Sequence, residues 1–244
     1  MGSLSGRIAL VTDGSRGIGR VIAERLARDG ALVAVHYGGD EAAAKETAAA
    51  IAEAGGCAFL VGAELGSPGG VDALTAALVA GLRAYGESAL DVLVHHAALP
   101  VVGRPVEAVT AEEFDETVAA HIGLPLLLTQ RLLPRLRDGG RIIHVSSGAG
   151  ARAGTASEAE GIAQALTKAA LDAFSHALRR HLGPRGITVN SLVVGRPGLH
   201  TWLAPGTGLA PGAQTASDAV AYLASDAAHW LTGARVDVPG VLGP

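Results

Sequence analysis

The chain has 244 residues, a formal net charge of −4 and 17% charged residues. This length fits one α/β domain over residues 1–244, which can bury roughly three quarters of the surface of its unfolded chain without disulfides or metals. Acidic and basic residues are mixed and form no basic block, which argues against nucleic acid as a partner. No apolar run approaches the roughly 18 residues of a transmembrane helix, so we expect no membrane span.

The chain contains one cysteine, Cys57, which excludes an intrachain disulfide framework. This residue lies in the apolar run 55–61, and we expect its thiol to be buried. The N-terminus enters a strand-like run without the basic segment of a secretory signal. Together these features predict a protein of the reducing cytoplasm.

Apolar runs of strand length alternate with stretches of helical periodicity along the chain. In chain order we predict strand 7–12, helix 17–29, strand 32–37, helix 41–54, strand 58–62, helix 70–84, strand 90–95, helix 111–136, strand 141–146, helix 160–182, and strands 187–193 and 234–238. The segment 196–215 is rich in Gly and Pro and lacks periodicity, so we predict a loop there.

Two of the predicted strands are apolar on both faces, as in Ile8-Ala9-Leu10-Val11 and Val92-Leu93-Val94. Strands of this kind belong to parallel sheets that helices cover on both faces. The sequence therefore predicts a Rossmann-like, doubly wound α/β fold with a parallel sheet of about seven strands. In such folds, ligands bind beyond the carboxyl ends of the strands.

A glycine-rich segment, Thr12-Asp13-Gly14-Ser15-Arg16-Gly17-Ile18-Gly19, joins the first predicted strand to the first helix. Glycines at such a turn allow the backbone to approach a pyrophosphate at the N-terminus of a helix. The candidate cofactor-binding residues are therefore Gly14, Ser15, Arg16, Gly17, Ile18 and Gly19.

Four further motifs accompany this loop, at 91–98, 142–147, 168–171 and 186–190. Together with the loop they resemble the short-chain dehydrogenase/reductase superfamily over almost the whole chain. The resemblance implies a catalytic group of Ser147, a tyrosine four residues before Lys168, Lys168 itself and an asparagine in the helix 111–136. In this chain Gln164 occupies the tyrosine position and His121 the asparagine position, so it is identified as a divergent member.

The replacement of the tyrosine by Gln164 removes the group that would protonate a carbonyl oxygen. A phenol beside an ammonium group has a lowered pKa and can donate its proton, whereas a carboxamide cannot near neutral pH. Gln164 and Ser147 can still donate hydrogen bonds to an oxyanion, and His121, near Lys168 by resemblance, is the candidate for proton transfer. The alternatives are that His121 packs beside a helix irregularity caused by Gly123 and Pro125, that Lys168 is a solvated surface residue and that Ser147 belongs to a turn.

The family positions that surround the cofactor are also changed. Asp13 stands in place of a glycine, His95-His96 in place of two asparagines, and Val194-Gly195 in place of Pro-Gly. A carboxylate about 4 Å from a pyrophosphate would oppose it by roughly 4 kcal/mol, and Asp13 could also cap the following helix and occupy the anion site itself. The alternative is that Asp13 faces a ribose hydroxyl. If a dinucleotide binds, Arg16 and the lack of an acid in His36-Tyr37-Gly38 favour NADP over NAD.

The adjacent histidines His95 and His96 invite comparison with metal ligands. Adjacent strand residues point to opposite faces, and no third ligand follows at a recognisable spacing, so we expect no metal site. His200 is a candidate for substrate contact and Glu158 or Glu160 for a base, although an exposed histidine and acids that complement a helix dipole are the alternatives.

The chain between Thr201 and Asp226 is shorter than in the family, which implies a trimmed lid and an open pocket for a bulky substrate. Our first hypothesis is a cofactor-independent enzyme of bacterial secondary metabolism that catalyses dehydration, cyclisation or Michael-type addition on a large, apolar, polyketide-like carbonyl compound. In this enzyme Ser147 and Gln164 donate hydrogen bonds to an enolate or β-hydroxycarbonyl oxygen of the substrate. His121, whose proton affinity Lys168 adjusts, transfers the proton. The alternatives are an atypical NADPH-dependent ketoreductase and a catalytically inactive scaffold or ligand-sensing protein.

The resemblance also implies that the helices 111–136 and 160–182 pair across a two-fold axis into a homodimer or homotetramer. Both helices carry apolar faces that permit this pairing, with leucines at 126–128 in the first and Leu166 and Phe174 in the second. The core of the domain is the competing use for these side chains.

Overall fold

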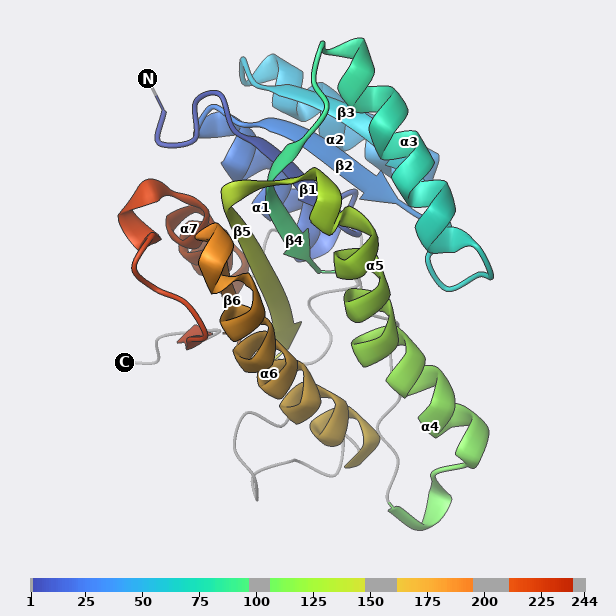
Figure 1. Cartoon of the computed structure of the whole chain (residues 1–244). Coiled ribbons are helices and arrows are strands. Elements are labelled where there is room, and N and C mark those ends of the chain that lie inside the picture. Colours follow the sequence, from blue (N-terminus) through green and yellow to red (C-terminus); the bar gives the residue numbers. More distant parts are fainter. Residues whose placement is uncertain (1, 97–105, 148–161, 195–210, 239–244) are drawn as a thin grey trace.

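The computed structural model describes residues 2–96, 106–147, 162–194 and 211–238, and in these ranges seven strands form one parallel sheet in the order β3-β2-β1-β4-β5-β6-β7 (Figure 1). The strands are β1 (Ile8–Val11), β2 (Leu32–Tyr37), β3 (Cys57–Gly62), β4 (Leu90–His95), β5 (Leu136–Ser147), β6 (Thr188–Val194) and β7 (Arg235–Val238). The prediction of a Rossmann-like, doubly wound sheet is confirmed.

Helices cover both faces of this sheet. The α-helices are α1 (Gly17–Arg28), α2 (Glu41–Glu53), α3 (Gly70–Ala84), α4 (Ala111–Val118), α5 (Leu124–Leu132), α6 (Ile162–Leu182) and α7 (Pro211–Ala224). The shorter segments are η1 (Val106–Ala108), η2 (Ala119–Gly123), η3 (Leu133–Arg135), η4 (Gly183–Arg185) and η5 (Asp226–Ala228), of which η2 is a π-helix.

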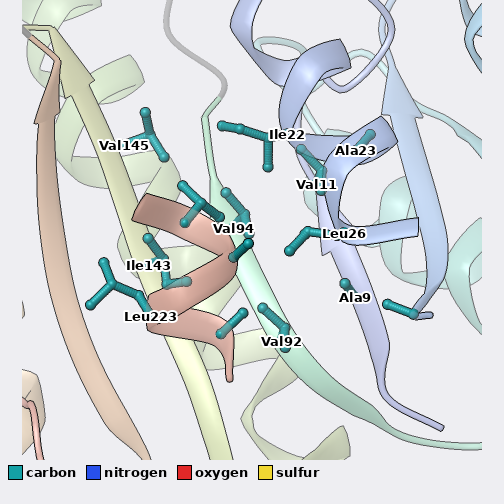
Figure 2. Close-up of a cluster of buried hydrophobic side chains, with 14 of the residues drawn as sticks. Ala9, Val11, Ile22, Ala23, Leu26, Val92, Val94, Ile143, Val145 and Leu223 are labelled. Carbon is teal, nitrogen blue, oxygen red and sulfur yellow. The ribbon is translucent and has the colours of Figure 1, made fainter. Parts of the chain in front are cut away.

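The side chains of each central strand alternate between two hydrophobic cores. In β1, Ala9 and Val11 contribute to the core beneath α1, α2 and α7, part of which Figure 2 shows. Ile8 and Leu10 contribute to the second core, beneath α3, α5 and α6. Because both faces of β1 are buried, its continuous apolar sequence is explained.

The strand order reverses direction at β1, which lies between β2 and β4. The loops that follow β1 and β4 therefore leave the sheet toward opposite faces, and a crevice opens at the carboxyl ends of these two strands. The glycine-rich segment 12–19 follows β1 directly, so the fold places it at this crevice.

The predicted helix 111–136 is irregular in its middle. Pro125 has no N–H group to bond to the carbonyl of His121, four residues earlier. The N–H group of Leu124 bonds instead to the carbonyl of Ala119, five residues earlier, which makes the π-helical turn η2. The expected irregularity beside His121 is confirmed, and the segment splits into α4, η2, α5 and η3.

Three sequence expectations are wrong. The segment 196–215 was predicted as a loop, but α7 already begins at Pro211, and its small residues are buried against α1. Strand β5 begins at Leu136 and not at 141, because Leu136 pairs with Leu90 before the ladder shifts its register. Cys57 is exposed because it starts β3, the edge strand of the sheet.

Candidate functional site

A pocket of about 1180 Å³ lies at the carboxyl ends of β1, β2 and β3, between the glycine-rich segment and the helices α3, α4 and α5. Apolar groups such as Leu65, Val71 and Leu124 form part of its wall. Its charged lining residues are Asp13, Arg16, Asp40, Glu64, Asp72, Glu116 and Arg131. The pocket thus occupies the region in which doubly wound folds bind their ligands.

The glycine-rich segment is fixed to both neighbouring strands. The N–H group of Thr12 donates to the carbonyl of Val94 at 3.1 Å, and the hydroxyl of Thr12 accepts the N–H group of His96 at 2.9 Å. On the other side, the N–H group of Gly14 donates to the carbonyl of His36 at 2.8 Å. These bonds hold the loop across the carboxyl ends of β2 and β4.

The glycines of this loop are required by space and by backbone conformation. A Cβ atom at Gly19 would lie 2.0 Å from the carbonyl oxygen of Asp13 and 2.8 Å from Nδ1 of His96. A Cβ atom at Gly14 would lie 3.0 Å from the carbonyl oxygen of Val11. Gly17 has a φ of +54°, in the left-handed region that favours glycine.

The first turn of α1 keeps its backbone donors without a side-chain cap. Arg16 is the N-cap residue, with extended backbone and no capping hydrogen bond from its side chain. Uncapped N–H groups at a helix N-terminus bind phosphate groups. Asp13 does not cap α1, so that part of the sequence expectation is wrong.

The carboxylate of Asp13 lies beside a cation. Its Oδ1 atom is 3.6 Å from Nε of Arg16, and the Arg16 side chain is largely exposed. This pairing offsets part of the repulsion that Asp13 would exert on a bound phosphate, although exposed ion pairs contribute only about 0–1 kcal/mol. Arg16 remains within reach of the pocket that it lines.

His121 lies in the middle of η2 and is buried, with 7% of its surface exposed. The η2 turn contacts α6, the helix that carries Gln164 and Lys168. Helix irregularities of the π type concentrate at functional sites because they turn side chains away from the regular helical stripe. The fold therefore brings the predicted His121 next to the helix of its predicted partners.

The other three predicted catalytic residues are described by their backbone positions. Ser147 is the last residue of β5, at the carboxyl edge of the sheet, opposite Val194 of β6. Gln164 and Lys168 lie in the first two turns of α6, one helical turn apart and hence on one face. The predicted residues His200, Glu158 and Glu160 lie outside the described residues.

The adjacent histidines point to opposite faces of the sheet, as predicted. The Nε2 atom of His95 bonds to the hydroxyl of Thr129 on α5 at 2.9 Å. The ring of His96 packs instead against Gly19 at the start of α1. Within the ranges that the structure describes, no group of three or more potential ligand side chains is placed to hold a metal ion.

A buried polar cluster beneath the site was not anticipated from the sequence. His95 stacks on His144 of β5, and Nδ1 of His144 is 2.7 Å from the hydroxyl of Ser175 on α6. That hydroxyl also donates to the carbonyl of Leu171, so it accepts the proton of His144 Nδ1. Only the register of β4 against β5, which pairs His95 with His144, could have shown this contact.

The sequence pattern of the short chain dehydrogenase family matches residues 7–198. The chain belongs to the short-chain dehydrogenase/reductase superfamily. This superfamily member is similar to the promiscuous reductase LugOII, which catalyses keto-reduction at C1 during lugdunomycin biosynthesis, with 45% identity, a TM-score of 0.86 and coverage of 98% of both chains.

Two further likenesses extend over almost the whole chain. The angucycline C-6 ketoreductase LanV, solved with bound NADP, shares 43% identity with a TM-score of 0.87 over 98% of this chain and 96% of LanV. A hydroxynaphthalene reductase of Aspergillus fumigatus is 31% identical over 99% of this chain and 94% of its own length. All three similar proteins of the superfamily are named as reductases.

These relatives contradict the hypothesis of non-redox chemistry. The expected cofactor-independent dehydration, cyclisation or Michael-type addition is wrong, and so is the expectation that no cofactor is required. The physical reason is that the replaced tyrosine supplies only a proton. Hydride transfer depends first on the positioning of a cofactor beside a carbonyl, and the glycines that allow close approach of a cofactor are present in the loop.

Among the described residues, no helix has both the length and the apolar character that a membrane crossing requires.

Proposed function

We propose that this protein is an NADPH-dependent ketoreductase that reduces a carbonyl group of a large, polycyclic, polyketide-like compound. The observation that carries the proposal is the near-full-length likeness, at 43% identity, to a ketoreductase solved with bound NADP. A second likeness, at 45% identity, is to a reductase that also acts in a biosynthetic pathway. The pocket of about 1180 Å³ offers room for a dinucleotide.

The residues around the loop fit a phosphate-bearing cofactor. Gly14 and Gly19 leave a cradle that Cβ atoms would fill, and the uncapped first turn of α1 supplies N–H donors. The exposed guanidinium of Arg16 is the cation that would distinguish the 2′-phosphate of NADPH. When bound, NADPH supplies the hydride for reduction of the carbonyl carbon.

The carbonyl oxygen needs hydrogen-bond donors and then a proton. Ser147 and Gln164 would donate hydrogen bonds to this oxygen as negative charge develops on it. Gln164 cannot give up a proton near neutral pH, so the proton comes from His121 or from a water molecule relayed through Lys168. Both candidates belong to elements that contact each other, η2 and α6.

Two measurements test the proposal. Calorimetric titration with NADPH should show binding, and the absorbance of NADPH should fall when a polycyclic aromatic ketone is added. The expected results are saturable binding below millimolar concentration and an alcohol product formed in equal amount with NADP⁺. Absence of NADPH binding at millimolar concentration would eliminate the ketoreductase and leave the inactive scaffold or ligand-sensing alternative.

Variants separate the proton donors from the rest of the site. His121→Ala or Lys168→Ala should lower kcat by roughly 10²- to 10⁴-fold if that residue delivers the proton, with little change in the Kd of NADPH. Lys45→Ala is the matched control, because Lys45 is exposed on α2 and pairs with Glu41 outside the pocket. Unchanged kcat in both variants would exclude these residues as the proton source.

The exposed apolar residues of α5 and α6 support a homodimer or homotetramer. Leu126 and Leu127 are 47% and 53% exposed, and Leu166 of α6 is 54% exposed. The neighbouring Leu128 is fully buried, so the core uses only part of this leucine run. Light scattering should give a multiple of the 24.4 kDa chain mass, and Leu126→Asp should lower it. A cytoplasmic location agrees with NADPH as cofactor.

A further inference from the structure

Among the described residues, Asp13 is the one non-glycine residue with a positive φ, at 48°. This left-handed conformation brings the Cβ atom of an L-residue close to the backbone at a steric cost, which aspartate tolerates better than most residues. The residue stands in the loop that would approach the cofactor, and it lines the pocket. A contact from elsewhere in the fold can offset this cost and fix the loop in this conformation.

His36, the fifth residue of β2, makes two hydrogen bonds to this turn. Its ring Nδ1 accepts the N–H group of Asp13 at 3.0 Å, and its main-chain carbonyl accepts the N–H group of Gly14 at 2.8 Å. Two consecutive N–H groups of the left-handed turn thus bond to one residue. The turn is tied to β2 through His36.

The tautomer of His36 suits this role. Its Nε2 atom lies 3.0 Å from the carbonyl oxygen of Ala63, which can only accept, so Nε2 carries the proton and donates it. The other ring nitrogen, Nδ1, is then an acceptor, as the N–H group of Asp13 requires. The ring is held from both sides, between the loop after β1 and the residue after β3.

His36 is almost completely buried, with 3% of its surface exposed. Burial lowers its pKa from the ordinary value of 6.5, although the carbonyl of Ala63 and the carboxylates of Asp13 and Glu64 oppose this change. In the described part of the chain, these two carboxylates are the charges that face the ring. The neutral ring, which can accept a hydrogen bond, is therefore the form that the fold favours at neutral pH.

We propose that His36 is a positioning residue, which holds Asp13 in the left-handed conformation and thereby shapes the loop for cofactor binding. The inference rests on the proposed function, because its readout is NADPH binding. It differs from a general structural role in one respect. A glycine at position 13 has no steric cost in the left-handed conformation, so the contribution of His36 should depend on the residue at position 13.

A double-mutant cycle tests this coupling. The Kd of NADPH is measured for the wild type, His36→Ala, Asp13→Gly and the double variant. His36→Ala removes the contact that favours the costly left-handed conformation of Asp13 and should weaken NADPH binding by about 10-fold or more. In the Asp13→Gly background the same substitution should weaken binding less than about 3-fold, because glycine enters the left-handed conformation without steric cost and only the hydrogen bond of its N–H group is lost.

A conservative variant distinguishes the effect of the hydrogen-bond acceptor at position 36 from that of the imidazole ring as a whole. In His36→Asn the amide oxygen can occupy the place of Nδ1, so NADPH binding should stay within about 3-fold of the wild type. The wild type should lose NADPH affinity as the pH falls below 6.5, since a protonated ring cannot accept the N–H group of Asp13. This loss should be smaller in His36→Asn, whose amide does not titrate, whereas the 2′-phosphate of NADPH titrates at about pH 6 with both proteins.

The outcomes distinguish the inference from the proposed function. If the wild type binds NADPH and His36→Ala has the same effect with Asp13 and with Asp13→Gly, the positioning role is wrong and the ketoreductase stands. Weak binding by His36→Asn as well as by His36→Ala would also overturn the role. If the wild type does not bind NADPH, both the inference and the proposed function fail.

Discussion

The imidazole rings of His95 and His144 stack with their centroids 4.9 Å apart in the middle of the sheet. They are paired residues of β4 and β5, and each is bonded to a helix above, His95 to Thr129 of α5 and His144 to Ser175 of α6. In the described part of the chain, Nε2 of His144 has no hydrogen-bond partner. The two helices that frame the candidate site are thus linked through a buried pair of neutral rings.

This pair should make the fold sensitive to acid. Burial lowers the pKa of His144 from 6.5 to about 3, and burial together with His144 lowers that of His95 well below 6.5. The folded state therefore binds fewer protons than the unfolded state, and the free energy of unfolding falls as pH falls from 6.5 toward about 3. Each such histidine contributes a slope of about 1.4 kcal/mol per pH unit in that window.

Chemical denaturation at a series of pH values would measure this slope. The variant His144→Phe retains the stacking on His95 and removes one titrating group. Its slope should therefore be smaller by about 1.4 kcal/mol per pH unit, the contribution of one proton. His181→Asn, at an exposed position near the end of α6, should change the free energy of unfolding by less than about 0.5 kcal/mol. An unchanged slope in His144→Phe would contradict the assignment.

Gly19→Ala should disrupt the cofactor loop. Its Cβ atom would lie 2.0 Å from the carbonyl oxygen of Asp13, a backbone atom that cannot rotate away. We expect a loss of roughly 1–3 kcal/mol in the free energy of unfolding and of most NADPH affinity. Gly183→Ala is the control, since nothing lies within 4 Å of a Cβ atom there. Equal melting temperatures and Kd values for the two variants would disprove the close contact.

Arg16→Ala should weaken NADPH binding more than NADH binding. The two cofactors differ by the 2′-phosphate, and charge-assisted hydrogen bonds of this kind contribute about 1.5–3 kcal/mol, or roughly 10- to 100-fold in Kd. The substitution also releases Asp13 from its 3.6 Å contact with Arg16, which adds repulsion toward both cofactors. The measurement is therefore the ratio of the Kd of NADPH to the Kd of NADH. A ratio in Arg16→Ala equal to that of the wild type would show that Arg16 does not bind the 2′-phosphate.

Gln164→Tyr should raise the rate of ketone reduction. It restores an ionisable phenol one helical turn before Lys168 on the same face of α6, where the superfamily places its proton donor. We expect kcat to rise by about 10-fold or more, because positioned proton transfer contributes roughly 10²- to 10⁴-fold. Gln164→Phe, which has the ring without the hydroxyl, is the control. A rate increase in both variants would indicate a packing effect.

Local sequence patterns were sufficient to predict the central strands and the class of fold. The apolar residues of β1 and β4 predicted strands buried on both faces, and alternation with helices predicted the doubly wound sheet. Helix α7 was not predicted at all, because Ala213 and Ala216 are small residues whose burial depends on α1, a partner distant in sequence. Exposure of Cys57 likewise follows from the edge position of β3, which depends on strand order.

In the candidate site, too, some features follow from the local sequence and others depend on the tertiary structure. The glycine-rich loop and the irregularity at Pro125 could be read from the sequence, and the four catalytic positions could be predicted from it, because each follows from local stereochemistry or from a motif. The role of the site was misjudged, because the absence of one tyrosine says nothing of the glycine-rich loop at which a cofactor would bind. The left-handed conformation of Asp13 and its bond to His36 also required the structure.

By itself, the sequence determined the superfamily, the alternation of strands and helices and the residues available for chemistry, since these depend on neighbours within a few positions of the chain. Only the tertiary structure decided that His36 meets Asp13 and that His95 meets His144. Those contacts are set by the order and register of parallel strands, which bring together residues that lie 23 positions apart in the first pair. Register follows from the packing of the whole sheet between its helices, which no single segment encodes.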